Sequence, residues 1–396
     1  MSIERVSENV YSIGVINPSL RVFDIVMEAK YGTSYNSYLI TGAKNVLVET
    51  VHNDYFDEYI NNIGSLVDLN DIEYIIMNHT ELDHSGSLKK LLDINPNITV
   101  VCTMAASKYL KNILNIDFKC KIVKDKETLS IGDKTLEFIV APLLHWPDSM
   151  MTWFKEENVL FSCDFLGCHF CEPTMFEENI KYKDKYLDEF KYYYQGIFSP
   201  FKPYVLKGLE KIKDLDIQFL CPSHGPILTS QIKKRMNDYL VWSSPKNTSN
   251  KNILILYASA YKCTKILAEA AADEISTSSD IEVNLLDMVD TPIDMVVQKI
   301  SDCDAIMVGS CTINKDAPKV VWDILSSIDA INTKSKPAGA FGSYGWSGEA
   351  VDMIKSRLSQ LKFNFIGDGI KVNFMPNDDD IKNMKKYAME IIQNIK

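Results

Sequence analysis

The chain has 396 residues, of which 46% are hydrophobic and 24% charged, so it is long enough for two or three globular domains with full cores. Its formal net charge of −11 argues against nucleic acid or an anionic membrane surface as the main partner. Residues 1–8 lack the basic start and apolar core of a secretory signal, and no apolar run approaches the roughly 20 residues that span a bilayer, so we expect a cytoplasmic protein.

The first half of the chain begins with several expected strands and then alternates strands with helices. β-Branched and aromatic residues between turn signals indicate the strands, and longer amphipathic runs indicate the helices. The expected strands are 21–26, 38–40, 45–49, 74–77 and 98–101, and the expected helices are 87–92 and 105–110.

The loop at 78–86, between a buried strand and a helix, holds four metal-capable side chains within six residues: His79, Glu81, Asp83 and His84. In extended backbone alternate residues point the same way, so the first three can converge. Two imidazoles and two carboxylates suit one or two transition metals such as zinc, iron or nickel. The alternative is a polar loop in which Ser85 or Asp83 merely caps the helix. The density of ligands favours the metal site.

Three more ligand-type residues also follow expected strands. His145 follows the strand at 136–140, Asp164 follows a hairpin, and His224 follows a short strand. The hairpin joins 151–154 to 159–162, and the short strand is 219–221. Loops at strand ends are where layered α/β folds place their sites. Any single histidine could be a satisfied core residue, but four of the six histidines fall in these loops, which favours a metal cluster.

The nine cysteines are scattered and odd in number, which does not suit a complete disulfide framework. Cys163, Cys168 and Cys171 lie close in sequence, and the last two form a Cys-x-x-Cys. A redox pair or an iron–sulfur site would use such a pattern. No fourth cysteine lies nearby and no second Cys-x-x-Cys exists, so we interpret these residues as structural thiols.

A polar run at 243–251 divides the chain, and the expected domains are 1–248 and 249–396. After it, strands alternate regularly with helices, which is typical of a doubly wound parallel sheet. The expected strands are 252–257, 283–286, 305–309 and 338–342, and the clearest expected helices are 264–275 and 379–396.

Three loops of the second half predict a site for flavin mononucleotide (FMN). The first opens a helix with hydroxyl side chains that can bind phosphate, although a simple helix cap would look similar. The other two follow later strands, and their glycines and aromatic residues can admit and cover a flat ring. A response-regulator-like module is the alternative, but it would need acidic residues at the strand ends. The loops comprise Ser259, Ala260, Tyr261, Lys262, Cys263 and Thr264; Ser310, Cys311, Thr312, Ile313 and Asn314; and Ser343, Tyr344, Gly345, Trp346, Ser347 and Gly348.

With these residues in view, the whole chain resembles the flavodiiron proteins, also called A-type flavoproteins. The resemblance rests on His79-x-Glu81-x-Asp83-His84, on the order of the later ligands, and on 343–348. It implies an α/β protein with an N-terminal αββα metallo-β-lactamase-like sandwich and a C-terminal flavodoxin-like doubly wound parallel sheet. It also implies a homodimer, head-to-tail, or a dimer of such dimers, in which each flavin lies beside the partner's irons.

The same resemblance implies a residue-by-residue assignment of two non-haem irons. One iron would be held by His79, Glu81 and His145, and the other by Asp83 and His224, with Asp164 bridging them. His84 is a ligand in some members of the family and not in others. His84 and His169 are the candidate catalytic residues, the second as a pocket residue.

Two departures from the family pattern concern the flavin loops. Lys262 stands where the family usually has glycine, and Cys311 where it usually has proline. We also expect no rubredoxin or flavin reductase domain beyond the flavodoxin-like unit. The electron donor would then be a separate protein, such as rubredoxin, or a reduced deazaflavin coenzyme.

The metal can be argued from the ligands themselves. Zinc hydrolases of the same fold carry His-x-His-x-Asp-His, whereas this chain has the hard oxygen of Glu81 at the second position, which favours iron. We therefore expect a reductase of dioxygen to water, of nitric oxide to nitrous oxide, or of both. The alternatives are a zinc-dependent hydrolase with a redox-sensing flavodoxin-like half, and a flavin electron carrier with a vestigial metal domain.

Overall fold

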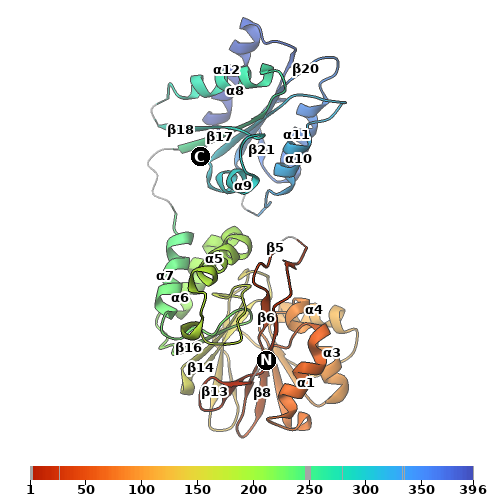
Figure 1. Cartoon of the computed structure of the whole chain (residues 1–396), viewed down its shortest axis with the longest axis vertical. Coiled ribbons are helices and arrows are strands. Elements are labelled where there is room, and N and C mark those ends of the chain that lie inside the picture. Colours follow the sequence, from red (N-terminus) through yellow and green to blue (C-terminus); the bar gives the residue numbers. More distant parts are fainter. Residues whose placement is uncertain are drawn as a thin grey trace. The chain divides into compact units, whose positions relative to one another are not determined.

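In the computed structural model (Figure 1), the residues described are 3–25, 27–245, 251–278, 280–331, 333 and 335–395. The chain divides into two compact units, Met1–Pro245 and Lys246–Lys396. The boundary expected at 248/249 lies outside the described residues, as does most of the predicted polar run. Within the described residues, no helix is both long and apolar enough to cross a membrane.

The first unit contains two large sheets. One has the order β1-β2-β7-β8-β9-β10-β11, and its strands are Glu4–Arg5, Val10–Ser12, Tyr38–Ile40, Asn45–Val48, Ile72–Met77, Thr99–Cys102 and Cys120–Ile122. The other has the order β12-β13-β14-β15-β16, and its strands are Thr128–Ser130, Thr135–Val140, Met150–Phe154, Val159–Cys163 and Phe219–Pro222. A small pair, β3 (Val15–Asn17) and β6 (Thr33–Tyr35), is antiparallel.

The two large sheets pack face to face, because alternate residues of each strand are apolar on the inner side. Their shared core includes Tyr38, Val48 and Ile76 from one sheet and Phe138 and Phe161 from the other. The outer faces are covered by helices, with α1, α3 and α4 on one side and α5, α6 and α7 on the other (Figure 1). These helices are Phe56–Gly64, Leu88–Ile94, Met104–Leu114, Lys183–Tyr193, Lys202–Ile212 and Ile232–Ser243, and a short α2 spans Leu82–Ser85. The predicted αββα sandwich is confirmed.

The strand predicted at 21–26 is wrong. The structure has two short antiparallel strands, β4 (Val22–Phe23) and β5 (Met27–Glu28). The chain turns between them at Asp24 and Ile25, which have φ of 46° and 70°, and Val26 lies outside the described residues. The sequence did not indicate this turn, because residues 21–26 contain no glycine, proline or asparagine, which are the usual signals of a turn.

The second unit is one sheet of parallel strands in the order β18-β17-β19-β20-β21, with β22 also pairing with β20. Its strands β17 to β22 are Lys251–Ala258, Ile281–Asp287, Ala305–Ser310, Pro337–Tyr344, Asn364–Phe365 and Ile370–Asn373. Helices α8 and α12 cover one face, and α9, α10 and α11 cover the other (Figure 1). The helices α8 to α12 are Cys263–Ile275, Ile293–Asp302, Lys319–Ser326, Glu349–Gln360 and Asp378–Gln393. The flavodoxin-like doubly wound sheet is confirmed, although the last helix ends at Gln393 rather than at the chain end.

Candidate metal centre and flavin loops

The seven predicted metal ligands come together at the ends of four strands. His79 and Glu81 lie in the loop after β9, and Asp83 and His84 lie in the short helix α2 that follows it. The other three follow β13, β15 and β16, which are neighbouring strands or one strand apart in the second sheet. They are His145, Asp164 and His224. Both sheets therefore contribute to one site at one edge of the sandwich.

His79, Glu81 and His145 form a first cluster of possible metal ligands. One carboxylate oxygen of Glu81 (Oε2) lies 3.1 Å from Nε2 of His79 and 3.6 Å from Nε2 of His145. His79 is fully buried, while the other two side chains retain some exposure.

Asp83, His84 and His224 form a second, entirely buried cluster. Nε2 of His224 lies 2.8 Å from Oδ2 of Asp83, and Nε2 of His84 lies 3.5 Å from Oδ1 of the same carboxylate. His84, whose role the family resemblance leaves open, thus turns a ring nitrogen toward this cluster.

Asp164 stands between the two clusters and directs one oxygen to each. Its Oδ2 lies 3.4 Å from Nε2 of His145 and 3.9 Å from Nε2 of His79. Its Oδ1 lies 3.2 Å from Nε2 of His84 and 3.5 Å from Nε2 of His224. One carboxylate is therefore shared by two sets of ligands.

The donor set fits two metal ions. Ring nitrogens lie within 3.5 Å of both carboxylate oxygens of Asp83 and of Oδ1 of Asp164, but among the described residues none makes a well-aligned hydrogen bond to these buried oxygens. Buried polar atoms normally have a partner, and a bound cation supplies one. Burial acts to raise the pKa of Asp83, but His84 and His224 hold it below its usual value, so the carboxylate stays ionised. Three carboxylates with four imidazoles suit iron better than zinc.

Two histidines of the centre are oriented by groups outside it. Asp148 lies 3.2 Å from Nδ1 of His79 and accepts hydrogen bonds from Thr80, at 2.9 Å from its N–H and 2.7 Å from its hydroxyl. Nδ1 of His224 lies 2.6 Å from the main-chain oxygen of Ser34. Such contacts fix the ring so that Nε2 faces a metal. Asp148 lies in the same loop as His145, between β13 and β14, but no local signal in the sequence marked it or Ser34.

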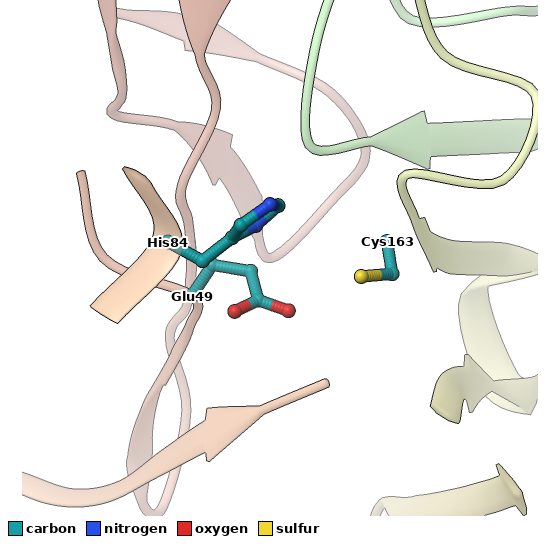
Figure 2. Close-up of side chains that lie close together, drawn as sticks. All are labelled: Glu49, His84 and Cys163. Atoms are coloured by element: carbon teal, nitrogen blue, oxygen red, sulfur yellow. The ribbon is translucent and has the colours of Figure 1, made fainter. Parts of the chain in front are cut away.

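Two further residues that the sequence did not single out as ligands lie beside His84: Glu49, which directly follows β8, and Cys163 (Figure 2). Oε1 of Glu49 accepts a hydrogen bond of 2.9 Å from the N–H of Asn78, while Oε2 is buried without a partner among the described residues. Burial raises the pKa of Glu49 to about 8. Glu49 and Cys163 also have positive φ, at 60° and 58°.

His169 lies beside the metal clusters and belongs to none of the described ligand groups. Its ring centroid is 4.0 Å from that of Phe23 and 4.9 Å from those of His224 and Tyr193. Nδ1 lies 2.9 Å from the hydroxyl of Thr33, and Nε2 is buried without a partner among the described residues. Burial lowers the pKa of His169 well below its ordinary value, so the ring is neutral.

The other predicted thiols lie outside these ligand groups. Cys171 donates its S–H to the main-chain oxygen of Tyr31 at 3.4 Å, and Cys168 is buried. Among the described residues, neither joins a cluster of possible metal ligands.

The three flavin loops lie together at the carboxyl ends of β17, β19 and β20, which are adjacent strands. The hydroxyls of Thr264 and Ser343 are 2.8 Å apart, and the N–H of Thr312 donates to the main-chain oxygen of Ser343 at 3.1 Å. Tyr261 and Trp346 are 86% and 74% exposed, so both rings are free to contact a ligand. The edge of a parallel sheet where these loops meet is the usual nucleotide position in this fold.

The two departures from the family pattern have local explanations. Lys262 is the residue before α8 and has φ of 66°, a conformation that glycine adopts most easily. Cys311 donates its N–H to the main-chain oxygen of Ala258 at 3.1 Å, a bond that proline could not make.

Comparisons with known proteins agree for both units. Residues 33–225 match the ODP family beta lactamase, and residues 255–386 match flavodoxin. The chain is 49% identical to "Flavo-diiron protein FprA2" of Clostridium acetobutylicum, over 99% of both chains, and 31% identical to the "Nitric oxide reductase" of Moorella thermoacetica, over 98% of both. The structure of rubredoxin oxygen:oxidoreductase from Desulfovibrio gigas superposes with a TM-score of 0.75 at 29% identity, covering 100% of this chain and 98% of that one.

Proposed function

The chain belongs to the flavodiiron proteins, and we propose that it reduces dioxygen to water, nitric oxide to nitrous oxide, or both. Relatives named for each of these gases support the proposal. The observation that carries it is the position of Asp164, whose two oxygens face two separate sets of ligands. FMN and a non-haem diiron centre are the cofactors.

In this proposal seven side chains hold the irons. His79, Glu81 and His145 hold one, and Asp83, His84 and His224 hold the other, with Asp164 shared. The inclusion of His84 rests on its Nε2, which lies 3.2 Å from Asp164 and 3.5 Å from Asp83. A bound pair of irons supplies a redox-active Lewis-acid site for a diatomic gas and electrons for its reduction.

Other residues of this chain shape that site. Asp148 keeps the ring of His79 turned so that Nε2 faces Glu81. The neutral ring of His169 and the ring of Phe23 pack against His224 and exclude water from that side. We assign His169 a role in the pocket rather than in metal binding, and His84 a role as a ligand.

Glu81 separates this proposal from a zinc hydrolase. Replacing Glu81 with histidine gives the nitrogen ligand of the hydrolases, so we expect E81H to lose iron and reductase activity. Iron content by mass spectrometry and gas consumption would both be measured. A gain of thioesterase or lactonase activity with retained metal would favour the hydrolase.

For the flavin, we propose that the three loops of the second unit hold FMN. Thr264 and the first turn of α8 would contact the phosphate, and Tyr344 or Trp346 would cover the ring. Bound FMN accepts electrons singly or in pairs and so connects a one-electron donor to the metal centre. Loss of FMN absorbance after Trp346→Ala would support this assignment.

We further propose a separate electron donor and a head-to-tail homodimer. The relative named for rubredoxin supports a rubredoxin-type donor. The dimer is testable by co-expressing a metal-site variant, Asp164→Ala, with a flavin-site variant, each with its own tag. Mixed dimers should regain activity if each flavin serves the partner's irons. If electrons pass within one chain, every mixed dimer should be inactive.

The first experiment is metal and flavin analysis of anaerobically purified protein, followed by reduction and mixing with dioxygen or nitric oxide. We expect about two irons and one FMN per chain, as a two-metal site with a flavin requires. Rapid reoxidation by either gas would identify the substrate. Zinc in place of iron, with no reoxidation by either gas, would overturn the proposal.

A further inference from the structure

A pair of cysteines lies away from the proposed metal ligands, on the outer edge of the first sheet. Sγ of Cys102 and Sγ of Cys120 are 3.7 Å apart. Cys102 ends β10, and Cys120 begins β11, the last strand in the order of that sheet. Among the described residues, no other two cysteine sulfurs lie within hydrogen-bonding range. Their separation in sequence gave no sign of this contact.

The strand register explains the contact. Val100 pairs with Cys120 and Cys102 pairs with Ile122 in parallel strands, so the two cysteines are diagonal neighbours. Side chains two residues apart on a strand share a face, and both thiols therefore lie on the same side of the sheet. Diagonal neighbours in a sheet lie about 7–8 Å apart, slightly beyond the usual Cα separation of a disulfide, so closing the 3.7 Å gap between the sulfurs to about 2.05 Å needs side-chain rotation and a small shift of one strand. β11 pairs with β10 alone in the described sheet, so it can adjust.

The environments of the two thiols differ. Cys102 is fully buried, whereas Cys120 is exposed. Hydrogen bonding from Cys102 lowers the pKa of Cys120, with a further contribution from Lys111. An exposed thiol with enhanced thiolate character, next to a buried resolving thiol, is the arrangement of a redox-sensitive pair.

We propose that Cys102 and Cys120 are a modification site at which hydrogen peroxide forms a reversible disulfide. The sulfur of Cys120 attacks one peroxide oxygen, the O–O bond breaks, and the products are a sulfenic acid and water. The sulfur of Cys102 then attacks that of Cys120, forming the S–S bond and releasing the oxygen as a second water with the thiol proton. Two electrons pass from the two thiols to one peroxide.

The new disulfide would join β10 to β11 next to a chain of contacts that leads to His79, a proposed metal ligand. Thr103 follows Cys102, caps α4 by accepting a hydrogen bond from the N–H of Ala106 at 3.1 Å, and donates to the main-chain oxygen of Asp148 at 3.1 Å. Asp148 in turn contacts His79.

The test is peptide mapping of the metal- and flavin-loaded protein before and after treatment with peroxide. Free thiols are alkylated, and the protein is cut before aspartate, because Lys119 and Lys121 would leave trypsin only a dipeptide around Cys120. Cys102 then lies in peptide 93–116 and Cys120 in peptide 117–124. We expect peroxide to join these peptides through a bond that dithiothreitol breaks.

Variants make the test specific. C120S, at an exposed position, should abolish the cross-link, and C102S should leave a sulfenic acid on Cys120 that dimedone traps. C171S removes a thiol without a cysteine partner and should still form the cross-link. If C102S does not fold, the C120S variant and the peptide map of the wild type still test whether the disulfide forms. Peptides that stay separate in the wild type, or a Cys120 bonded mainly to a second molecule, would overturn the proposal.

Discussion

At the scale of single residues, the metal centre depends on groups that bind no metal in our assignment. The imidazole of His79 can rotate about its side-chain bonds, and the contact of Nδ1 with Asp148 favours the orientation in which Nε2 faces Glu81. Asp148 is itself fully buried and held by Thr80. The hydrogen-bond network thus selects which nitrogen is offered to a cation.

We therefore predict that Asp148→Asn weakens the centre without removing a ligand. The amide can still hydrogen-bond to His79 but does not carry the charge that favours the correct tautomer. Loss of such a partner typically lowers metal affinity or activity by about 10- to 100-fold. Iron retention during dialysis against a chelator would measure the loss of metal affinity. Asp133→Asn, at an exposed position of the same unit, is the control. Equal retention by both variants would contradict the prediction.

A second prediction concerns Lys262 and its positive φ of 66°. A side chain costs about 1 kcal/mol in this conformation, so Lys262→Gly should stabilise the second unit by that amount or less. Lys265→Gly is the matched control, since position 265 lies inside α8, where glycine costs about 1 kcal/mol. Hydrogen exchange of β17 and α8 peptides at increasing urea would measure both. A loss of stability in both variants would show that the left-handed turn is not strained.

The convergence of the candidate ligands could be predicted from the sequence, but the residues that orient them could not. Ligand-type residues at strand ends are a local pattern, and the structure brings His79, His145 and His224 together as expected. Glu49 contacts the centre through partners that are distant in sequence. Such partners cannot be identified from a single sequence, because only the packing of the two sheets brings them together.

At the scale of elements, long sequence patterns predicted the secondary structure correctly and short ones did not. The second unit's strands are buried on both faces and read as continuous apolar runs, so β17, β19 and β20 were found. The hairpin β4–β5 was not predicted, because each of its strands has two residues, too few to show the alternation of side chains that marks a strand. Phe23, which directly precedes the turn at Asp24 and Ile25, packs against His169, a residue distant in sequence.

The start of helix α12 is stabilised by a hydrogen-bonded cap. Asn377 accepts hydrogen bonds from the N–H groups of Asp379 and Asp380 at 2.9 and 3.0 Å, and Asp380 accepts from the N–H of Asn377 at 3.0 Å. Asn377→Ala should cost about 1 kcal/mol by removing this cap. Asn383→Ala, exposed inside the same helix, should be neutral or stabilising. Hydrogen exchange of peptides from 378–393 would be compared, and equal effects would argue against the cap.

At the scale of the whole molecule, each unit has its own apolar cores and its own set of proposed cofactor-binding residues. The apolar clusters of the first unit contain only residues before 245, and those of the second only residues after 251. The two units can therefore lose stability separately, each through the ligand that it binds.

We predict that removing metal lowers the unfolding temperature of the first unit alone. A ligand that binds only the folded state stabilises it by RT ln(1 + [L]/Kd), which is about 4.1 kcal/mol at a thousandfold excess over Kd. Without metal, the buried oxygens of Asp83 and Asp164 also lack the cation that would partner them. Calorimetry of the full chain with and without chelator should show one transition falling while the FMN-linked transition stays. Removal of FMN should do the reverse. If both transitions move together under either treatment, the units unfold as one cooperative body and the prediction is wrong, because separate cores then do not mean separate stabilities.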